Sequence, residues 1–335
     1  MTTFTSCAPR LAGLCIASPS QVEENISLID QFGQKAMMDI IQSTGIERRP
    51  IARTETIAQL GTLAARKVIS KLNWDADSIE AIVVVTQTPD YPLPSTAILI
   101  QHALGLKAST IALDINLGCS GYVYGLSVIN GLMQTAGLKR VLLVCGDITS
   151  RMIDIKDRGL RPLFGDAVAA TALELTKGTY ITMDLGSDGS GAPYLISRTG
   201  GVVEPGLPRL FMDGVQVMAF SLRRVTPSVE AVLKLAKCNI DEINAVIFHQ
   251  ANAMMLKNLA RKIGANEDQL VMAIKDFGNT SSASIPLALA SWLLHRKEHS
   301  QDLKLLLSGF GVGWSWATAL WETTKPEVVE FVQSP

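Results

Sequence analysis

Three residues of this chain, Cys119, His249 and Asn279, have side chains that suit one kind of chemistry. A cysteine thiolate can attack a thioester and hold the acyl group covalently. A histidine and an asparagine can donate neutral hydrogen bonds to an oxyanion, where a carboxylate would repel the developing charge. These residue types therefore predict acyl transfer through a cysteine, assisted by a pair of hydrogen-bond donors.

Cys119 lies in the segment DINLGCSGYVYGLSVINGLMQ, where a strand pattern changes to a helix pattern. Gly118 and Gly121 indicate a sharp turn, and apolar residues then recur at helical spacing from Val123. A thiol at a helix N-terminus lies near free N–H groups and the positive end of the helix dipole, which both favour the thiolate. We expect the other four cysteines to be small buried hydrophobes.

His249 follows the apolar segment INAVIFHQ at the end of an expected strand, a common place for ligand sites in α/β proteins. Asn279 lies in GNTSSAS, a tight turn before a helix that contains Pro286. An asparagine in such a turn can also be a simple helix cap. The glycine-rich segment GFGVG, residues 309–313, follows the last buried strand and can present a backbone N–H to a site.

Together these residues suit a decarboxylative condensation. The backbone N–H groups of Cys119 and of the GFGVG turn would stabilise the oxyanion formed when the thiolate attacks. His249 and Asn279 would donate hydrogen bonds to a second thioester carbonyl, where an enolate forms as a malonyl group loses CO2. The enolate would then attack the acyl-cysteine and form a carbon–carbon bond.

The elements around these residues occur twice. Apolar strands are expected over 79–87, 110–116 and 141–147, with helices over 57–72, 95–104 and 122–136. Residues 243–250 and 303–311 repeat the first and third strand patterns 164 and 163 positions later, and the Asn279 segment takes the place of the Cys119 segment. The chain therefore predicts two similar α/β halves, residues 1–178 and 179–335, related by a pseudo-twofold axis.

Composition excludes several other classes of protein. The 335 residues are 47% hydrophobic and have a formal net charge of -1, which argues against a nucleic-acid binder. Five irregularly spaced cysteines without a CxxC pair indicate a reducing compartment, here the cytoplasm, and no metal site. No apolar run is long enough to span a membrane, and residues 11–15 read as part of a first strand. Without a dinucleotide loop, we expect no cofactor.

The chain resembles the β-ketoacyl-acyl carrier protein synthase III family of the thiolase superfamily. The resemblance rests on GCSGYVYGL, HQAN, GNTSSAS and GFGVGWSWA, on TGIERR near residue 44, and on DRG and FGDA in residues 157–167, in that family's order over nearly the whole length. It implies a five-layered αβαβα thiolase fold and a homodimer. Acyl-coenzyme A and acyl carrier protein thioesters are then the substrates, and acyl carrier protein is the partner.

The resemblance also implies the roles of individual residues. Cys119 accepts the acyl group, His249 and Asn279 serve decarboxylation, Phe310 lies beside them, and Gly311 and Val312 belong to the oxyanion turn. Arg158, Asn252 and Leu93 are expected to bind substrate, with Leu93 at the end of the acyl tunnel. We expect the cations Lys257, Arg261 and Lys262 to contact the carrier protein, because Met254 stands where the family commonly has an arginine.

Other departures lie at the entrance to the site. Asp39 and Ser43 stand where a tryptophan and an arginine commonly hold coenzyme A, and MDGVQVM, residues 212–218, replaces an asparagine-containing turn. An alternative function is therefore a same-fold acyltransferase that passes the acyl group to a hydroxyl or amine of a sugar or secondary metabolite. A non-catalytic partner subunit would usually lack one of the three residues, and a papain-like protease would not have the twofold repeat.

Overall fold

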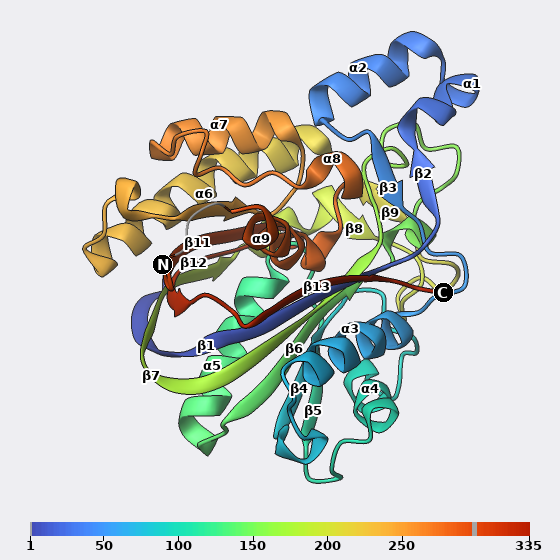
Figure 1. Ribbon diagram of the computed structural model, residues 1–335. Coiled ribbons are helices and arrows are strands. Elements are labelled where there is room, and N and C mark those ends of the chain that lie inside the picture. The colour runs from blue at the N-terminus through green and yellow to red at the C-terminus, as the bar shows by residue number, and fades with distance from the viewer. Residues whose placement is uncertain (1, 297–299) are drawn as a thin grey trace.

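The structure, a computed structural model, describes residues 2–296 and 300–335. Its main sheet is mixed (Figure 1). The strands of this sheet are β1 (Thr2–Ser18), β4 (Ala81–Val85), β5 (Ile111–Ile115), β6 (Arg140–Asp147), β7 (Ala167–Ser187), β10 (Ala245–Phe248), β11 (Asp302–Gly311), β12 (Ser315–Thr324) and β13 (Val328–Gln333). Two short pairs lie outside it: β2 (Val22–Glu24) with β3 (Arg48–Pro50), and β8 (Leu195–Ser197) with β9 (Leu210–Met212).

Helices separate the strands, and most begin or end as the predicted pattern requires. They are α1 (Ile29–Phe32), α2 (Gln34–Thr44), α3 (Ile57–Lys71), α4 (Thr96–Leu104), α5 (Gly121–Ala136), α6 (Gly214–Ala236), α7 (Ala253–Ile263), α8 (Ile274–Phe277) and α9 (Ser284–His295). A capping box between Thr56 and Gln59 starts α3, and the left-handed Gly137 ends α5. The helices expected over 57–72, 95–104 and 122–136 are confirmed to within a residue at each end.

Three buried clusters arrange these elements in five layers. The central cluster packs α5 and α9 between sheet faces, and the second packs α3 and α4 on the outer face of the first half. The third packs α6 and α7 on the outer face of the second half. The αβαβα prediction is therefore confirmed, with α5 and α9 as the shared middle layer (Figure 1).

The internal repeat appears in the strand register. Ala81 pairs with Val141 between the parallel strands β4 and β6, and Ala245 pairs with Leu305 between the parallel strands β10 and β11. Each residue of the second pair lies 164 positions after its counterpart. The boundary expected at residue 178 lies inside β7, where the partner of that strand changes from β6 to β12. Because β7 crosses this boundary, strands of both halves belong to one continuous sheet.

Two expectations from the sequence are wrong. Cys7 is exposed, although Cys15, Cys145 and Cys238 are buried as expected. The strand predicted at 110–116 should be buried on both faces, but β5 is the edge of the main sheet and its residues are half-buried or exposed. Among the described residues, no further strand pairs with that edge.

Candidate active site

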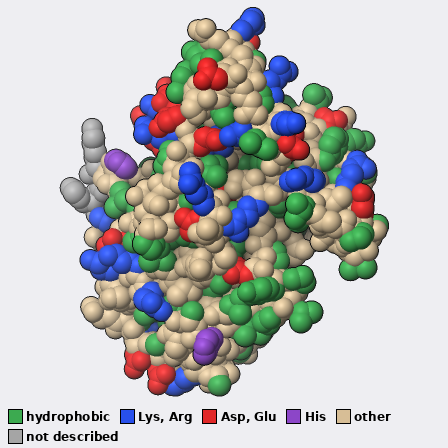
Figure 2. All heavy atoms as spheres, turned by 90° about the vertical axis from the view of Figure 1, so that its right-hand side faces the viewer, with side chains coloured by type: hydrophobic (Ala, Val, Ile, Leu, Met, Phe, Trp, Pro, Cys, Tyr) green, Lys and Arg blue, Asp and Glu red, His purple; other side chains and the backbone are tan. Residues whose placement is uncertain are grey.

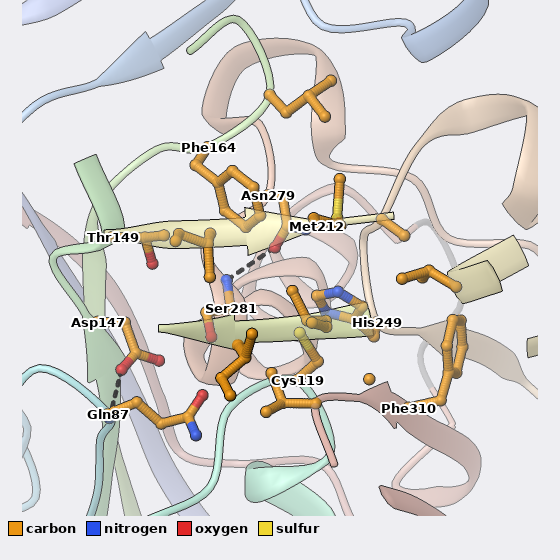
Figure 3. Close-up of a pocket in the computed structure, with 18 of the residues that line it drawn as sticks. Gln87, Cys119, Asp147, Thr149, Phe164, Met212, His249, Asn279, Ser281 and Phe310 are labelled. Atoms are coloured by element: carbon orange, nitrogen blue, oxygen red, sulfur yellow. Dashed lines mark hydrogen bonds between the residues drawn. The ribbon is translucent and has the colours of Figure 1, made fainter. Parts of the chain in front are cut away.

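A cavity of about 420 Å³ lies where strand ends from the first half meet loops from the second half. Cys119, His249 and Asn279 all line it, although they come from three separate loops (Figure 3). Phe310, Gly311, Val312 and Asn252 line the same cavity. The fold thus brings together residues that the sequence could only propose as partners.

Cys119 lies in the turn between β5 and α5, as predicted, and its side chain is 8% exposed. Gly121 starts α5 where a Cβ would lie 2.4 Å from Val85, so glycine lets the turn pack against β4. From the other half, a Cβ at Gly311 would lie 3.0 Å from the Cys119 Sγ atom. The glycine of the GFGVG turn therefore allows the backbone of β11 to reach the thiol.

Burial, rather than the helix N-terminus, dominates the titration of Cys119. Desolvation, reinforced by the nearby charge of Asp147, raises the pKa of the Cys119 thiol to about 12. A hydrogen bond with Ser281 acts in the opposite direction but is the smaller effect. Burial therefore opposes the effect expected from the helix N-terminus, and the attack requires a proton acceptor.

His249 directly follows β10 and is 2% exposed. Its Nδ1 atom lies 2.7 Å from the Ser284 hydroxyl at the start of α9, and the Ser281 backbone is a second hydrogen-bond partner of the ring. The ring of Phe310 meets the imidazole edge-on, with centroids 5.7 Å apart. Burial lowers the pKa of His249 to about 3, so the ring is neutral at neutral pH and can accept or donate a proton.

Asn279 is held by contacts that leave its amide nitrogen toward the cavity. Its backbone N–H donates to the Leu163 carbonyl at 2.8 Å, and its carbonyl accepts from Gly165 at 3.1 Å. The side-chain Oδ1 accepts from the Ser281 N–H at 2.9 Å, which assigns the other end of the amide as the NH2 donor. The same contact caps the N–H of Ser281, the first residue of the short 3-10 helix Ser281–Ala283, so the capping role expected above and the orientation of the amide come from one hydrogen bond.

Two backbone donors at the nucleophile have no acceptor in any other described residue. The N–H groups of Cys119 and Val312 make no hydrogen bond to another described residue, although nearly all buried donors in proteins do. Val312 follows the last residue of β11, next to the glycine that contacts the thiol. Such a pair of free donors is the feature that an oxyanion hole requires.

Sequence reasoning missed the polar residues on the other side of Cys119. Asp147 ends β6 and accepts hydrogen bonds from the Gln87 N–H at 2.6 Å and from the Ser282 hydroxyl at 2.7 Å. Burial raises the pKa of this carboxyl group. Gln87, Asn116 and Thr149 also line the cavity. Their positions in the sequence could have indicated this. Each of these residues ends or follows a parallel strand, and the carboxyl ends of such strands commonly form ligand sites.

The three residues expected to bind substrate are placed differently from one another. Asn252 lines the cavity, but its side chain caps α7 by accepting from the Met255 N–H at 2.8 Å. Arg158 lies outside the cavity, in a shallow depression with Asp39 and Lys35. Leu93 is 81% exposed and does not reach the cavity of its own chain.

The expected carrier-protein contacts share one helix. Lys257, Arg261 and Lys262 are exposed on α7, which begins at the cavity residue Asn252. On the face that carries β2 and β3, Lys and Arg side chains are mixed with acidic and hydrophobic ones (Figure 2). No helix of the described residues is long and apolar enough to cross a membrane, and no described group of three acidic, His or Cys side chains could hold a metal ion.

Known proteins match this chain over nearly its whole length. The family models "3-Oxoacyl-[acyl-carrier-protein (ACP)] synthase III" and its "C terminal" part match residues 113–189 and 233–323. A β-ketoacyl-[acyl-carrier-protein] synthase III of Clostridium tetani is 35% identical and covers 83% of this chain and 87% of its own.

Solved structures match as well. A 3-oxoacyl-(acyl-carrier protein) synthase of Burkholderia xenovorans LB400 superposes with a TM-score of 0.94 at 38% identity, covering 99% of both chains. The priming β-ketosynthase of the R1128 polyketide pathway superposes with a TM-score of 0.87 at 29% identity, covering 96% of this chain and 98% of its own.

Proposed function

This chain belongs to the 3-oxoacyl-[acyl-carrier-protein] synthase III family and is an acyl-transferring condensing enzyme, and we propose that Cys119, His249 and Asn279 carry out its reaction. One observation carries the assignment of these residues. Their three side chains line one cavity, and the two unpartnered backbone donors lie at the thiol. The arrangement supports an acyl thioester loaded on Cys119 and extended by a malonyl thioester.

In the loading step, His249 takes the proton that the buried thiol holds. Burial raises the pKa of the thiol and lowers that of His249, so this proton transfer is unfavourable on its own and is driven by the formation of the bond from Sγ to the acyl carbon. The Sγ atom then bonds to the acyl carbonyl carbon, and the carbon–sulfur bond of the donor thioester breaks. The leaving thiolate takes the proton from His249. The N–H groups of Cys119 and Val312 stabilise the tetrahedral oxyanion between these events.

In the condensing step, His249 and Asn279 act as donors. The malonyl thioester loses CO2, and the electron pair of the broken bond becomes an enolate whose oxygen accepts hydrogen bonds from Nε2 and Nδ2. The enolate carbon attacks the acyl carbonyl, Cys119 leaves as a thiolate, and a proton from solvent restores the thiol. A serine hydroxyl can donate or accept, so Ser284 supports both tautomers of His249 that the two steps require.

The donor of the acyl group is a carrier-protein thioester in this proposal. In the depression near Arg158, Asp39 is paired with Lys35 at 2.9 Å and stands where the family commonly has the tryptophan that holds coenzyme A. The exposed cations lie on α7, whose first turn lines the cavity, and they suit an acidic carrier. Coenzyme A thioesters are then the slower donors.

A homodimer is supported by the unpaired edge of the main sheet. β5 is apolar, half-exposed and at the edge, which leaves backbone donors and acceptors without partners in one chain. The exposed Leu93 follows β4, the strand beside β5. Pairing of β5 with its copy would cover this edge and place Leu93 against the partner subunit. A cytoplasmic location stays a prediction from cysteine usage.

Intact-protein mass spectrometry tests the proposed function. The protein is mixed with acyl carrier protein and coenzyme A thioesters, and malonyl-acyl carrier protein is then added. We expect one acyl adduct that Cys119→Ala abolishes and that the malonyl carrier removes with release of CO2. Cys7→Ser, which changes the exposed cysteine, is the matched control and should keep the adduct. An adduct that only a hydroxyl or amine acceptor removes would instead support simple acyl transfer.

A further inference from the structure

The cavity has two ends with different chemistry. One end, which we call the polar chamber, is lined by Gln87, Thr88, Asn116, Asp147 and Thr149. The other is lined by apolar residues, among them Leu195, Leu210, Met212, Val217, Met218 and Met255. Figure 3 shows Cys119 between His249 and Phe310 on one side and Gln87 and Asp147 on the other. The nucleophile therefore lies between a group of polar residues and a group of mainly apolar ones, although the apolar Phe164 lies beside Thr149 (Figure 3).

The acyl group on Cys119 belongs in the polar chamber. His249 and Asn279 act on the carbonyl of the incoming thioester, so its pantetheine arm must approach past them. The acyl chain attached to Sγ then extends toward the opposite side, where the Gln87 amide lies. The closeness of that amide is clear from Gly118, where a Cβ would lie 2.4 Å from Gln87 Oε1.

Several polar atoms of the chamber have no partner in the described chain. The Thr149 hydroxyl makes no hydrogen bond, although its residue is buried, and Figure 3 shows it at the cavity wall. Gln87 donates from Nε2 to the Asn116 Oδ1 at 3.3 Å, which leaves Gln87 Oε1 and Asn116 Nδ2 unpaired. Thr149 is buried, whereas Gln87 is half-buried and Asn116 is exposed, so an alkyl chain that reaches Thr149 would displace water from its hydroxyl without replacing the hydrogen bond, which is unfavourable.

The chamber also excludes charge. Asp147 already accepts hydrogen bonds from Gln87 and Ser282 and from the Thr86 hydroxyl, so it is not available to a ligand. No described lysine or arginine lines the cavity, and its only acidic residue is Asp147. A substrate carboxylate would therefore meet a like charge and no cation. A neutral group with hydrogen-bonding oxygen fits both properties.

We propose that the acyl group this enzyme loads on Cys119 is oxygen-substituted, with a neutral hydroxyl or keto oxygen that hydrogen-bonds to Thr149, Gln87 and Asn116. This inference rests on the proposed function and specifies its substrate class. Thr149 and Gln87 are then specificity-determining residues. A site built around a substrate oxygen discriminates strongly against the analogue that lacks it, because the polar groups of the site are left unpaired.

The test compares acyl groups of equal shape. We would measure loading of 3-hydroxybutanoyl against 3-methylbutanoyl, and 4-hydroxybutanoyl against pentanoyl, as N-acetylcysteamine thioesters, by intact mass over time. In each pair a hydroxyl replaces a methyl group. We expect at least one hydroxyacyl group to load tenfold or more faster than its alkyl partner, and succinyl to load more slowly than either member of that pair.

Two variants test the residues themselves. Thr149→Val keeps the shape of the side chain and should reduce the hydroxyacyl preference about tenfold, and Gln87→Met is a second variant with the same expected direction. Thr135→Val, on an exposed position of α5, is the matched control and should keep the preference. Equal loading within both pairs, or an unchanged preference in both chamber variants, would overturn the inference while Cys119 loading still supported the proposed function. Failure of every thioester to load Cys119 would overturn both.

Discussion

The loops before α5 and α9 occupy equivalent places in the two halves, yet they carry different chemistry. Cys119 lies two positions before Gly121, the first residue of α5, whereas Asn279 lies five positions before Ser284, the first residue of α9. With the shorter spacing, Cys119 lies in the turn directly before α5. The longer loop contains an extra turn whose Ser281 N–H orients the Asn279 amide as a donor.

Each of these loops is also held by the opposite half. The Cys119 turn packs against Gly309 and Gly311 of β11, and the Asn279 backbone bonds to Leu163 and Gly165. Neither half alone could therefore place its own reactive residue. These contacts between the halves give the duplicated fold one shared site at its junction instead of two similar sites. The two loops then have different roles in the reaction.

The largest effect is expected at the nucleophile. Cys119→Ala removes the only atom that can hold the acyl group, so loading should fall by at least about 10⁴-fold. Quench-flow with a radiolabelled acyl donor measures this rate. Covalent labelling that continues at the original rate would place the nucleophile elsewhere.

Asn279→Ala should slow decarboxylation much more than loading, which would assign the two loops to different reaction steps. Loss of one oxyanion donor typically slows a reaction by about 10²–10³-fold, and here the loss should fall on decarboxylation. Loading of Cys119 should change much less, because the Cys119 and Val312 donors remain. Release of labelled CO2 from malonyl carrier, compared with adduct formation, gives the two rates. An equal fall in both would contradict the division of roles.

Gly311→Ala tests the contact between the halves. The new methyl group would lie 3.0 Å from Sγ and 2.8 Å from the Cys119 Cβ, so the thiol or the strand must shift. A displacement of about 1 Å at a reacting atom can cost about 10²-fold in rate. Gly131→Ala, on α5 with no atom within 4 Å of the added Cβ, is the matched control and should load normally. Normal loading by the Gly311 variant would show that the approach is not tight.

Ser284→Ala should have a smaller effect, of about tenfold on turnover, because one hydrogen bond to the His249 Nδ1 is lost. We interpret Ser284 as a positioning residue. Ser284→Thr keeps a hydroxyl and should restore turnover, with unchanged thermal midpoints in both variants. A rate that follows the thermal midpoint instead of the hydroxyl would indicate a purely structural role.

The buried histidine should also affect stability as pH falls. Burial lowers the pKa of His249 to about 3, whereas an unfolded histidine titrates near 6.5. Between these values the unfolded chain binds a proton that the folded chain does not, so the free energy of unfolding falls by up to about 1.4 kcal/mol per pH unit as the pH is lowered. The unfolding free energy is measured by urea denaturation at pH 7 and at pH 5. Its decrease between these two pH values should be smaller in His249→Gln than in the unchanged protein. Equal slopes would contradict the assignment.

Local sequence patterns determined most of the framework. The strand–turn–helix transition at Cys119, the strand before His249, the helices at 57–72, 95–104 and 122–136, and the repeat near 164 residues are all properties of short segments. Because hydrophobic periodicity and turn residues act locally, they can be read without knowing what packs against them. The family resemblance, rather than these local patterns, implied the five layers, and the buried clusters confirm them.

Tertiary structure alone decided the electrostatics and the lining of the site. The local rule predicted a low pKa for Cys119, but burial by residues far along the chain outweighs the helix N-terminus. Gln87, Asn116 and Thr149 are ordinary polar residues in the sequence, and they meet because β4, β5 and β6 are parallel and end at one edge. Desolvation and cavity chemistry depend on which distant segments pack together, and no short segment contains that information.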